Sequence, residues 1–331
     1  MTPMTSPTLH ARLDAAARFD AEYGASLSNH LPMTLTALAR LGADDERLAE
    51  FVAHYVLRLH DAPPTEPWSA GDPWRERLSD PRAWPTYRAL FRDWLVYEDA
   101  EPMLAQVLPV LLQGVGATAF HGLIRTAYAL AAQHAGELAD ALAYWACRWF
   151  RCGASAGVGD VADPARVLVL LEAVEVPERP LISQSMALAA ADPRVASALA
   201  RLHVDRHTTL PRLAQLAAER YAAQGGFTTL HLVTSAQALH ALLRFIDADD
   251  QQAALANYAL AYGAAWATLG PTSASPAAPL ELLPWPELVA RAVESDDEHV
   301  IKLVDSCREQ ERAYGGAVWA RAASRVVAQG V

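Results

Sequence analysis

Apolar residues recur along almost the whole chain at the three-to-four-residue period of an α-helix, and no convincing run alternates at period two. A chain with this pattern lacks the alternation of a sheet with one buried face, so we predict an all-α fold with essentially no sheet. The hydrophobic content of 52%, dominated by alanine and leucine, also favours helices. With 331 residues the chain can bury a large core, and we expect one large multi-helix domain over residues 1–331, with residues 1–10 flexible.

The periodicity predicts helices over residues 13–23, 35–41, 44–59, 84–94, 101–112, 118–133, 136–150, 164–174, 182–190, 194–202, 210–223, 228–246, 250–268, 286–293, 296–310 and 313–328. The segment Asp61 to Asp80 is rich in proline and tryptophan. We expect it to form a loop or lid that packs through its aromatic side chains.

Charge and cysteine content exclude several classes of protein. The net charge is −11 and no basic stripe with interleaved aromatics occurs, which argues against a nucleic-acid partner. Three cysteines without a CxxC pair predict no disulfide framework or zinc knuckle, and we expect a cytoplasmic protein. Pro102 to Ile124 carries no charged residue but is interrupted by glycine, proline and glutamine, so it predicts two buried helices meeting at Gly114–Gly116 rather than a membrane span.

The chain contains a single lysine, Lys302, against 26 arginines (27 Lys+Arg minus one). Unlike a guanidinium, an amine can lose its proton when desolvated and attack a carbonyl or capture carbon dioxide as a carbamate. Coding bias against lysine is the alternative explanation for its isolation. His299 precedes Lys302 by three residues, so both side chains share one helix face. That face is either a surface on which Lys302 pairs with Glu298, or the wall of a site.

Three other histidines lie in segments that could line a pocket. His121, Arg125 and Tyr128 fall on one stripe of an otherwise apolar helix, which indicates either a pocket wall or a hydrogen-bonded core network. His231 follows a glycine turn, and His30 lies at a helix junction before Pro32. We expect the remaining histidines at polar faces or helix ends to be solvated: His10, His54, His60 and His134.

Four segments of the chain resemble the questin oxidase-like family. They are Ser28-Asn29-His30-Leu31-Pro32-Met33, Phe120-His121-Gly122-Leu123-Ile124-Arg125-Thr126-Ala127-Tyr128, Thr228-Thr229-Leu230-His231-Leu232-Val233-Thr234 and Asp297-Glu298-His299-Val300-Ile301-Lys302-Leu303. Their order and spacing extend the resemblance over roughly Tyr23 to Arg312.

The resemblance implies an all-helical fold with a mononuclear non-haem Fe(II). Its implied ligands are His30, His121, His231, His299 and Lys302 as N6-carboxylysine. Family members often carry a histidine where this chain has Gln237, so Gln237 receives no ligand role and the substrate pocket is expected to differ.

The implied activity is that of a metal-dependent oxygenase or oxidase that inserts oxygen into an aromatic polyketide or quinone ring, in a Baeyer–Villiger-like or ring-cleaving reaction. Dioxygen is the expected co-substrate, with NADPH as a further one where a reductant is needed. We expect Arg125 and Tyr128 to orient a phenolate or quinone oxygen, and the tryptophan-rich segment Trp68 to Trp94 to cover the substrate. Two alternatives stay open: a carbamyl-lysine metal hydrolase, and a non-catalytic helical binding module with an apolar ligand cavity.

Overall fold

The computed structural model describes residues 6–69, 73–154, 157–271 and 280–330. The chain is 69% helical, which confirms the all-α prediction. The α-helices are α1 (Pro7–Ala16), α2 (Leu31–Leu41), α3 (Asp45–Tyr55), α4 (Trp84–Tyr97), α5 (Ala100–Leu111), α6 (His121–Ala132), α7 (Ala135–Cys147), α8 (Pro164–Leu171), α9 (Ile182–Ala191), α10 (Pro193–Ala200), α11 (Thr209–Gln224), α12 (Phe227–Leu242), α13 (Ala248–Ala267), α14 (Trp285–Glu294), α15 (Glu298–Tyr314) and α16 (Val318–Gln329). Short 3-10 turns are η1 (Val56–Arg58), η2 (Trp74–Arg77), η3 (Pro81–Ala83), η4 (Leu112–Gly114) and η5 (Leu243–Phe245).

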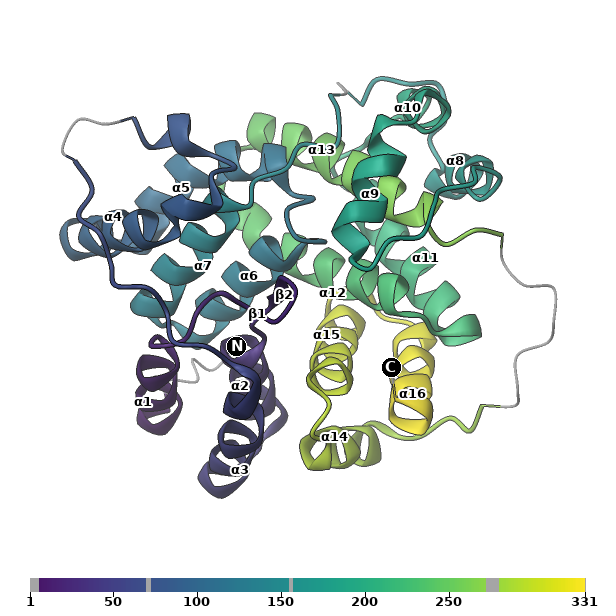
Figure 1. Ribbon diagram of the computed structural model, residues 1–331. Coiled ribbons are helices and arrows are strands. Elements are labelled where there is room, and N and C mark those ends of the chain that lie inside the picture. The colour runs from purple at the N-terminus through teal and green to yellow at the C-terminus, as the bar shows by residue number, and fades with distance from the viewer. Residues whose placement is uncertain (1–5, 70–72, 155–156, 272–279, 331) are drawn as a thin grey trace.

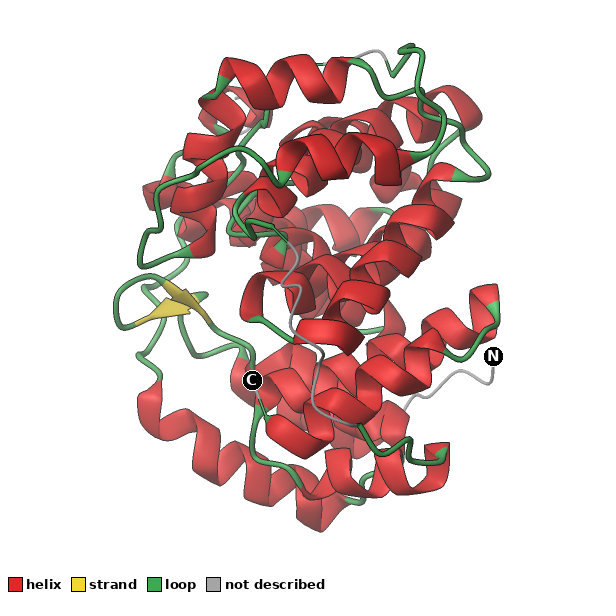
Figure 2. Cartoon of the chain, turned by 90° about the vertical axis from the view of Figure 1, so that its right-hand side faces the viewer, coloured by secondary structure: helices red, strands yellow, loops and turns green. Residues whose placement is uncertain are grey.

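Within the described residues the only sheet is an antiparallel hairpin of β1 (Glu22–Tyr23) and β2 (Leu27–Ser28), the small pair of arrows in Figure 2. Tyr23 pairs with Leu27 across a turn that holds Gly24 and Ser26 at φ of 54° and 66°. Strands of two residues are too short to produce a period-two pattern, so the hairpin replaces the end of the helix expected over residues 13–23.

The first helix begins earlier than expected. Ser6 accepts a hydrogen bond from the backbone N–H of Leu9, and Pro7 occupies the first helical turn, where its missing N–H has no cost. Leu9 is buried. Residues 7–10, for which we expected flexibility, thus form the start of α1, and residues 1–5 lie outside the described residues.

Four helices form a closed ring at the centre of the molecule: α2 packs against α6 and α15, and both of these pack against α12 (Figure 1). The outer helices surround this ring. α7 packs on α6, and α4 packs on the outer side of α7. α11 packs on α12, and α16 packs on α15. α13 packs on α8, α9 and α10. The long helix α13 is buried on all sides from Ala254 to Ala267, which is why it shows no single apolar stripe.

The uncharged segment Pro102 to Ile124 forms α5, the η4 turn and the start of α6. None of the described helices is both long and apolar enough to cross a membrane.

The described part of the proline- and tryptophan-rich segment packs on α4. Trp68 stacks on Tyr87 at 5.5 Å between ring centroids, and Trp74 packs edge-on against Phe91. Tyr87 also donates a hydrogen bond to the Trp74 carbonyl. Packing through aromatic side chains is confirmed.

Candidate metal centre

The N-terminal ends of the four ring helices meet at one point, and each brings at least one of the predicted ligands. His30 caps α2, His121 is the first residue of α6, and His231 lies in the second turn of α12. His299 and Lys302 lie in the first two turns of α15. The structure thus brings together all five side chains that the sequence analysis named as ligands.

Local sequence explains why each helix begins at this point. Asn29 accepts a hydrogen bond from the Leu31 N–H ahead of Pro32, and Asp297 accepts one from the His299 N–H. α12 follows Gly225 and Gly226, which have φ of 70° and 102°.

The start of α6 is unusual because three consecutive non-glycine residues precede it in the left-handed region. Thr118, Ala119 and Phe120 have φ of 46°, 53° and 71°. Such conformations cost of order 1 kcal/mol or more per residue and persist only where the surrounding structure holds them. Here the turn points the Thr118 carbonyl at the Nδ1 of His121, with which it forms a short hydrogen bond.

The ring nitrogens converge to within hydrogen-bonding distance. The Nε2 of His121 lies 2.8 Å from the Nε2 of His30 and 3.4 Å from the Nε2 of His231. The ring centroids of His30 and His299 are 4.8 Å apart. The Nζ of Lys302 lies 2.9 Å from the Nδ1 of His30.

The protons on two of these rings follow from their carbonyl partners. A carbonyl oxygen can only accept, so Nδ1 of His121 donates to Thr118 and Nδ1 of His231 donates to Phe227 at 2.8 Å. In the neutral rings each Nε2 therefore carries a lone pair, and these two lone pairs face one another. The buried Nε2 of His299 has no hydrogen-bond partner among the described residues.

Burial favours the neutral form of the four histidines. It is the main cause that lowers the pKa of all four histidines below the usual value, to about 3 for His121. The positive ends of four helices act in the same direction, because they disfavour an imidazolium. Burial also lowers the pKa of Lys302 to about 8, against the opposing charge of Glu298.

A carboxylate stands at the edge of the cluster. Glu298 is buried, and its Oε1 lies 3.9 Å from the Nδ1 of His30 and 3.5 Å from the guanidinium of Arg58. His30, Glu298 and His299 each place one donor atom within 4.8 Å of the others, a grouping that could hold a metal ion.

Phe227 separates the cluster from solvent on one side. Its ring lies 4.7 Å from the rings of both His231 and His299, and the residue is 45% exposed. His30, His121 and His231 are therefore buried and His299 is partly exposed, so the cluster lies close to solvent.

Comparison with protein families gives a match to the questin oxidase-like family over residues 27–307. The matched segment includes all four N-terminal helix ends that build the cluster. The chain belongs to the questin oxidase-like family. A comparison with curated proteins found no match. Membership of this family supports an oxidase or oxygenase that acts on anthraquinone-like substrates.

The two residues expected to orient a substrate, Arg125 and Tyr128, form hydrogen bonds to other parts of the protein. Arg125 is buried and forms a two-pronged ion pair with Glu137 of α7, at 2.6 and 2.9 Å. The hydroxyl of Tyr128 donates to the Lys302 carbonyl at 3.4 Å. Both side chains lie on the predicted stripe, but their contacts are those of a hydrogen-bonded core network that joins α6 to its neighbours.

The histidine rings contact Phe227 and one another, whereas Trp68, Trp74 and Trp94 contact α4, so the structure gives no support to a tryptophan cover over the cluster. His134, expected to be solvated, is buried and accepts a hydrogen bond from the Glu137 N–H at the start of α7. Gln237 is half-buried on α12.

Glu298 was not anticipated as a donor. In the sequence it is one acid among several at a helix start, and its spacing to Lys302 indicates an ordinary ion pair. Only the meeting of α15 with His30 on α2 places its carboxylate at the cluster.

Proposed function

We propose that this protein is a non-haem Fe(II) oxygenase that inserts oxygen into an electron-rich aromatic or quinone ring. The proposed ligands are His30, His121, His231, His299 and Lys302 as N6-carboxylysine. The observation that supports a metal most directly is the pair of facing lone pairs on His121 and His231. Two acceptors 3.4 Å apart repel one another, and a cation bound by both nitrogens would turn this repulsion into attraction.

The donor set fits a metal ion in three respects. Metal–imidazole bonds of about 2.1 Å place neighbouring ligand nitrogens about 3 Å apart, close to the spacings found here. Histidine ligands typically donate their second ring N–H to a carbonyl or carboxylate, as His121 and His231 do, and the Nδ1 of His299 lies 3.4 Å from Asp297. The unpartnered Nε2 of His299 provides a further donor.

An anionic ligand would strengthen binding of a divalent cation, because four neutral imidazoles at four positive helix ends supply no negative charge to balance it. Lys302 can become such a ligand: its neutral amine attacks carbon dioxide, a nitrogen–carbon bond forms, and one proton passes to Glu298. The lowered pKa of Lys302 favours the neutral amine that this step requires. The product is a carbamate, which offers anionic oxygens like a carboxylate but at the end of a longer side chain than that of Asp or Glu.

Fe(II) bound here would supply one-electron chemistry with dioxygen. The protein contributes a water-poor environment, four imidazoles of which His121 and His231 are held in fixed tautomers by carbonyl partners, and Phe227 as the side chain that the substrate must displace or pack against. Dioxygenation transfers both oxygen atoms and needs no reductant. Monooxygenation releases one oxygen as water and consumes two electrons and two protons, for which we propose NADPH as the co-substrate.

Metal content and dioxygen uptake test this proposal. We expect about one iron per chain and dioxygen uptake with a hydroxyanthraquinone, both lost in His231→Ala. His240→Ala is the matched control because His240 lies on the same helix, exposed, and contacts Tyr314 instead of the cluster. Iron-independent turnover, or a zinc-dependent hydrolysis without dioxygen uptake, would contradict the proposal.

A further inference from the structure

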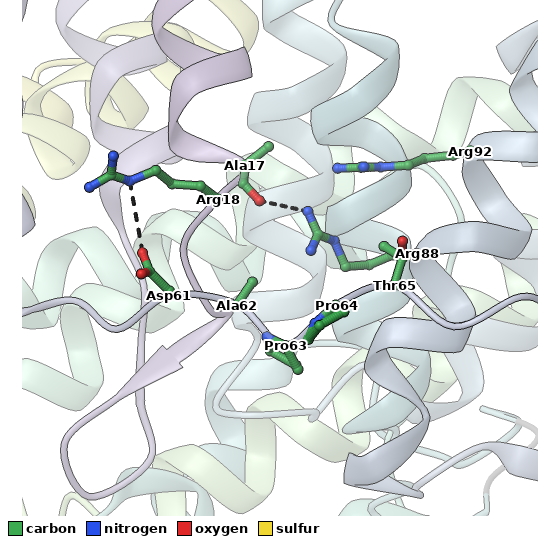
Figure 3. Close-up of a pocket in the computed structure, with 9 residues that line it drawn as sticks. All are labelled: Ala17, Arg18, Asp61, Ala62, Pro63, Pro64, Thr65, Arg88 and Arg92. Carbon is green, nitrogen blue, oxygen red and sulfur yellow. Dashed lines mark hydrogen bonds and ion pairs between the residues drawn. The ribbon is translucent and has the colours of Figure 1, made fainter.

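A shallow surface cavity of about 530 Å³, largely open to solvent, lies away from the histidine cluster, where the end of α1, the segment 61–65 and α4 come together (Figure 3). Its lining residues are Ala17, Arg18, Asp61, Ala62, Pro63, Pro64, Thr65, Arg88 and Arg92. The metal-centre proposal assigns no role to any of them.

The lining is positively charged in an acidic protein. Its three arginines and one aspartate give a net charge of +2, and the buried Asp140 that pairs with Arg88 and Arg92 lowers the local balance to +1. The chain as a whole carries −11. A concave positive patch on such a protein favours an anion over a cation.

The arginines have more donors than their protein partners use. Arg88 is buried and held by both oxygens of Asp140, at 2.9 and 2.8 Å, and by the Ala17 carbonyl at 2.7 Å. Arg92 shares Asp140, but its buried Nε has no hydrogen-bond partner among the described residues. Arg18 lies 3.9 Å from an exposed Asp61 and has a side chain that is 70% exposed. In Figure 3 Arg88 and Arg92 extend from α4 toward Ala17.

The walls of the cavity are preformed by backbone contacts. The Ala62 N–H donates to the Arg18 carbonyl at 2.7 Å, and the Asp20 N–H donates to the His60 carbonyl at 2.9 Å. These bonds tie the segment 61–65 to the end of α1. The remaining wall is made by the apolar Ala17, Ala62, Pro63 and Pro64 together with the polar Thr65. The two prolines have no N–H to offer a ligand.

We propose that this cavity binds a small organic molecule through a phosphate monoester group. Guanidinium groups donate to several phosphate oxygens at once, and a phosphate monoester near neutral pH carries a charge of about −1.5 to −2, opposite in sign to the local excess of positive charge. The volume exceeds what a single phosphate fills, so the organic part packs on Ala17, Ala62 and the prolines.

Calorimetric titration of the full chain with phenyl phosphate, in a buffer without phosphate, tests this inference. We expect one saturable site with a Kd below about 1 mM, and inorganic phosphate binding about tenfold more weakly. In Arg18→Gln/Arg92→Gln we expect the affinity for phenyl phosphate to fall about tenfold or more. Arg321→Gln, an exposed arginine on α16, removes one charge elsewhere and should change nothing.

The double variant retains Arg88, so Asp140 keeps its buried partner and the fold should be preserved, as an unchanged melting temperature would show. Three results would overturn the inference: no saturation up to about 10 mM phenyl phosphate, equal affinity for phenyl phosphate and inorganic phosphate, or undiminished binding by the folded double variant. None of these outcomes depends on whether the histidine cluster binds iron.

Discussion

At the scale of single residues, the left-handed turn before His121 couples backbone strain to the position of one proposed ligand. Replacing Ala119 by glycine relieves strain at φ 53° but removes a buried methyl group and adds freedom to the unfolded chain. We expect the free energy of unfolding to change by less than about 1 kcal/mol, while metal affinity falls about tenfold because the more flexible turn holds the Thr118 carbonyl less firmly against the His121 ring.

Gln133→Gly is the control for Ala119→Gly. Gln133 ends α6 in the same conformation, also at φ 53°, but at the opposite end of the helix from His121. It should leave metal affinity unchanged. Equal loss of affinity in both variants, in equilibrium metal titrations, would show that general loosening of α6 and not the turn is responsible.

At the scale of elements, the ring of ligand-bearing helices depends on buried ion pairs between helices. Arg40 at the end of α2 contacts Asp305 and Glu309 of α15 at 3.0 and 2.9 Å, and Asp305 is fully buried. Arg40→Ala leaves Asp305 without its cation, so we expect a loss of about 3 kcal/mol in the free energy of unfolding, measured in urea.

Arg312→Ala provides the comparison, because Arg312 pairs with the same Glu309 but has a side chain that is 58% exposed. The expected loss is below about 0.5 kcal/mol. Similar losses in the two variants would contradict the view that the α2–α15 contact is held by the buried pair.

Elements were predictable where the signal is local. The period of apolar residues located the helices because core-facing positions recur along each one. The early start of α1 was visible in Ser6 and Pro7, a cap followed by a proline, but the weak apolar pattern there obscured it. The four histidines and Lys302 were found through motifs. The ion pairs of Arg125 and the approach of Glu298 to His30 could not be found, because they join residues from helices whose packing no local pattern specifies.

At the scale of the whole molecule, the buried thiols should make the free energy of unfolding fall as the pH becomes alkaline. Burial raises the pKa of Cys152 from 9.0 to about 12, and raises those of Cys147 and Cys307 as well. The unfolded chain loses these protons first, so the contribution to stability is complete below pH 9.0 and is lost as pH rises toward the folded pKa values.

Each thiol should lower the free energy of unfolding by about 1.4 kcal/mol per pH unit in this window. Urea unfolding at a series of pH values measures how steeply the free energy of unfolding falls with pH. Cys152→Ser should make this slope shallower by the contribution of one thiol. A pH-independent stability across the window would show that the thiols are accessible to solvent in the folded state.

The central claim is that Lys302 binds metal as a carbamate, and ¹³C NMR of the protein supplied with ¹³C-bicarbonate tests it most directly. A diamagnetic divalent metal replaces iron for this measurement. We predict one protein-bound carbamate signal, which disappears when the metal is removed and is absent in both Lys302→Ala and Lys302→Arg, because an arginine cannot form the carbamate ligand. Full metal binding by the wild-type protein without a carbamate signal would contradict the claim and would leave Glu298 as the anionic ligand.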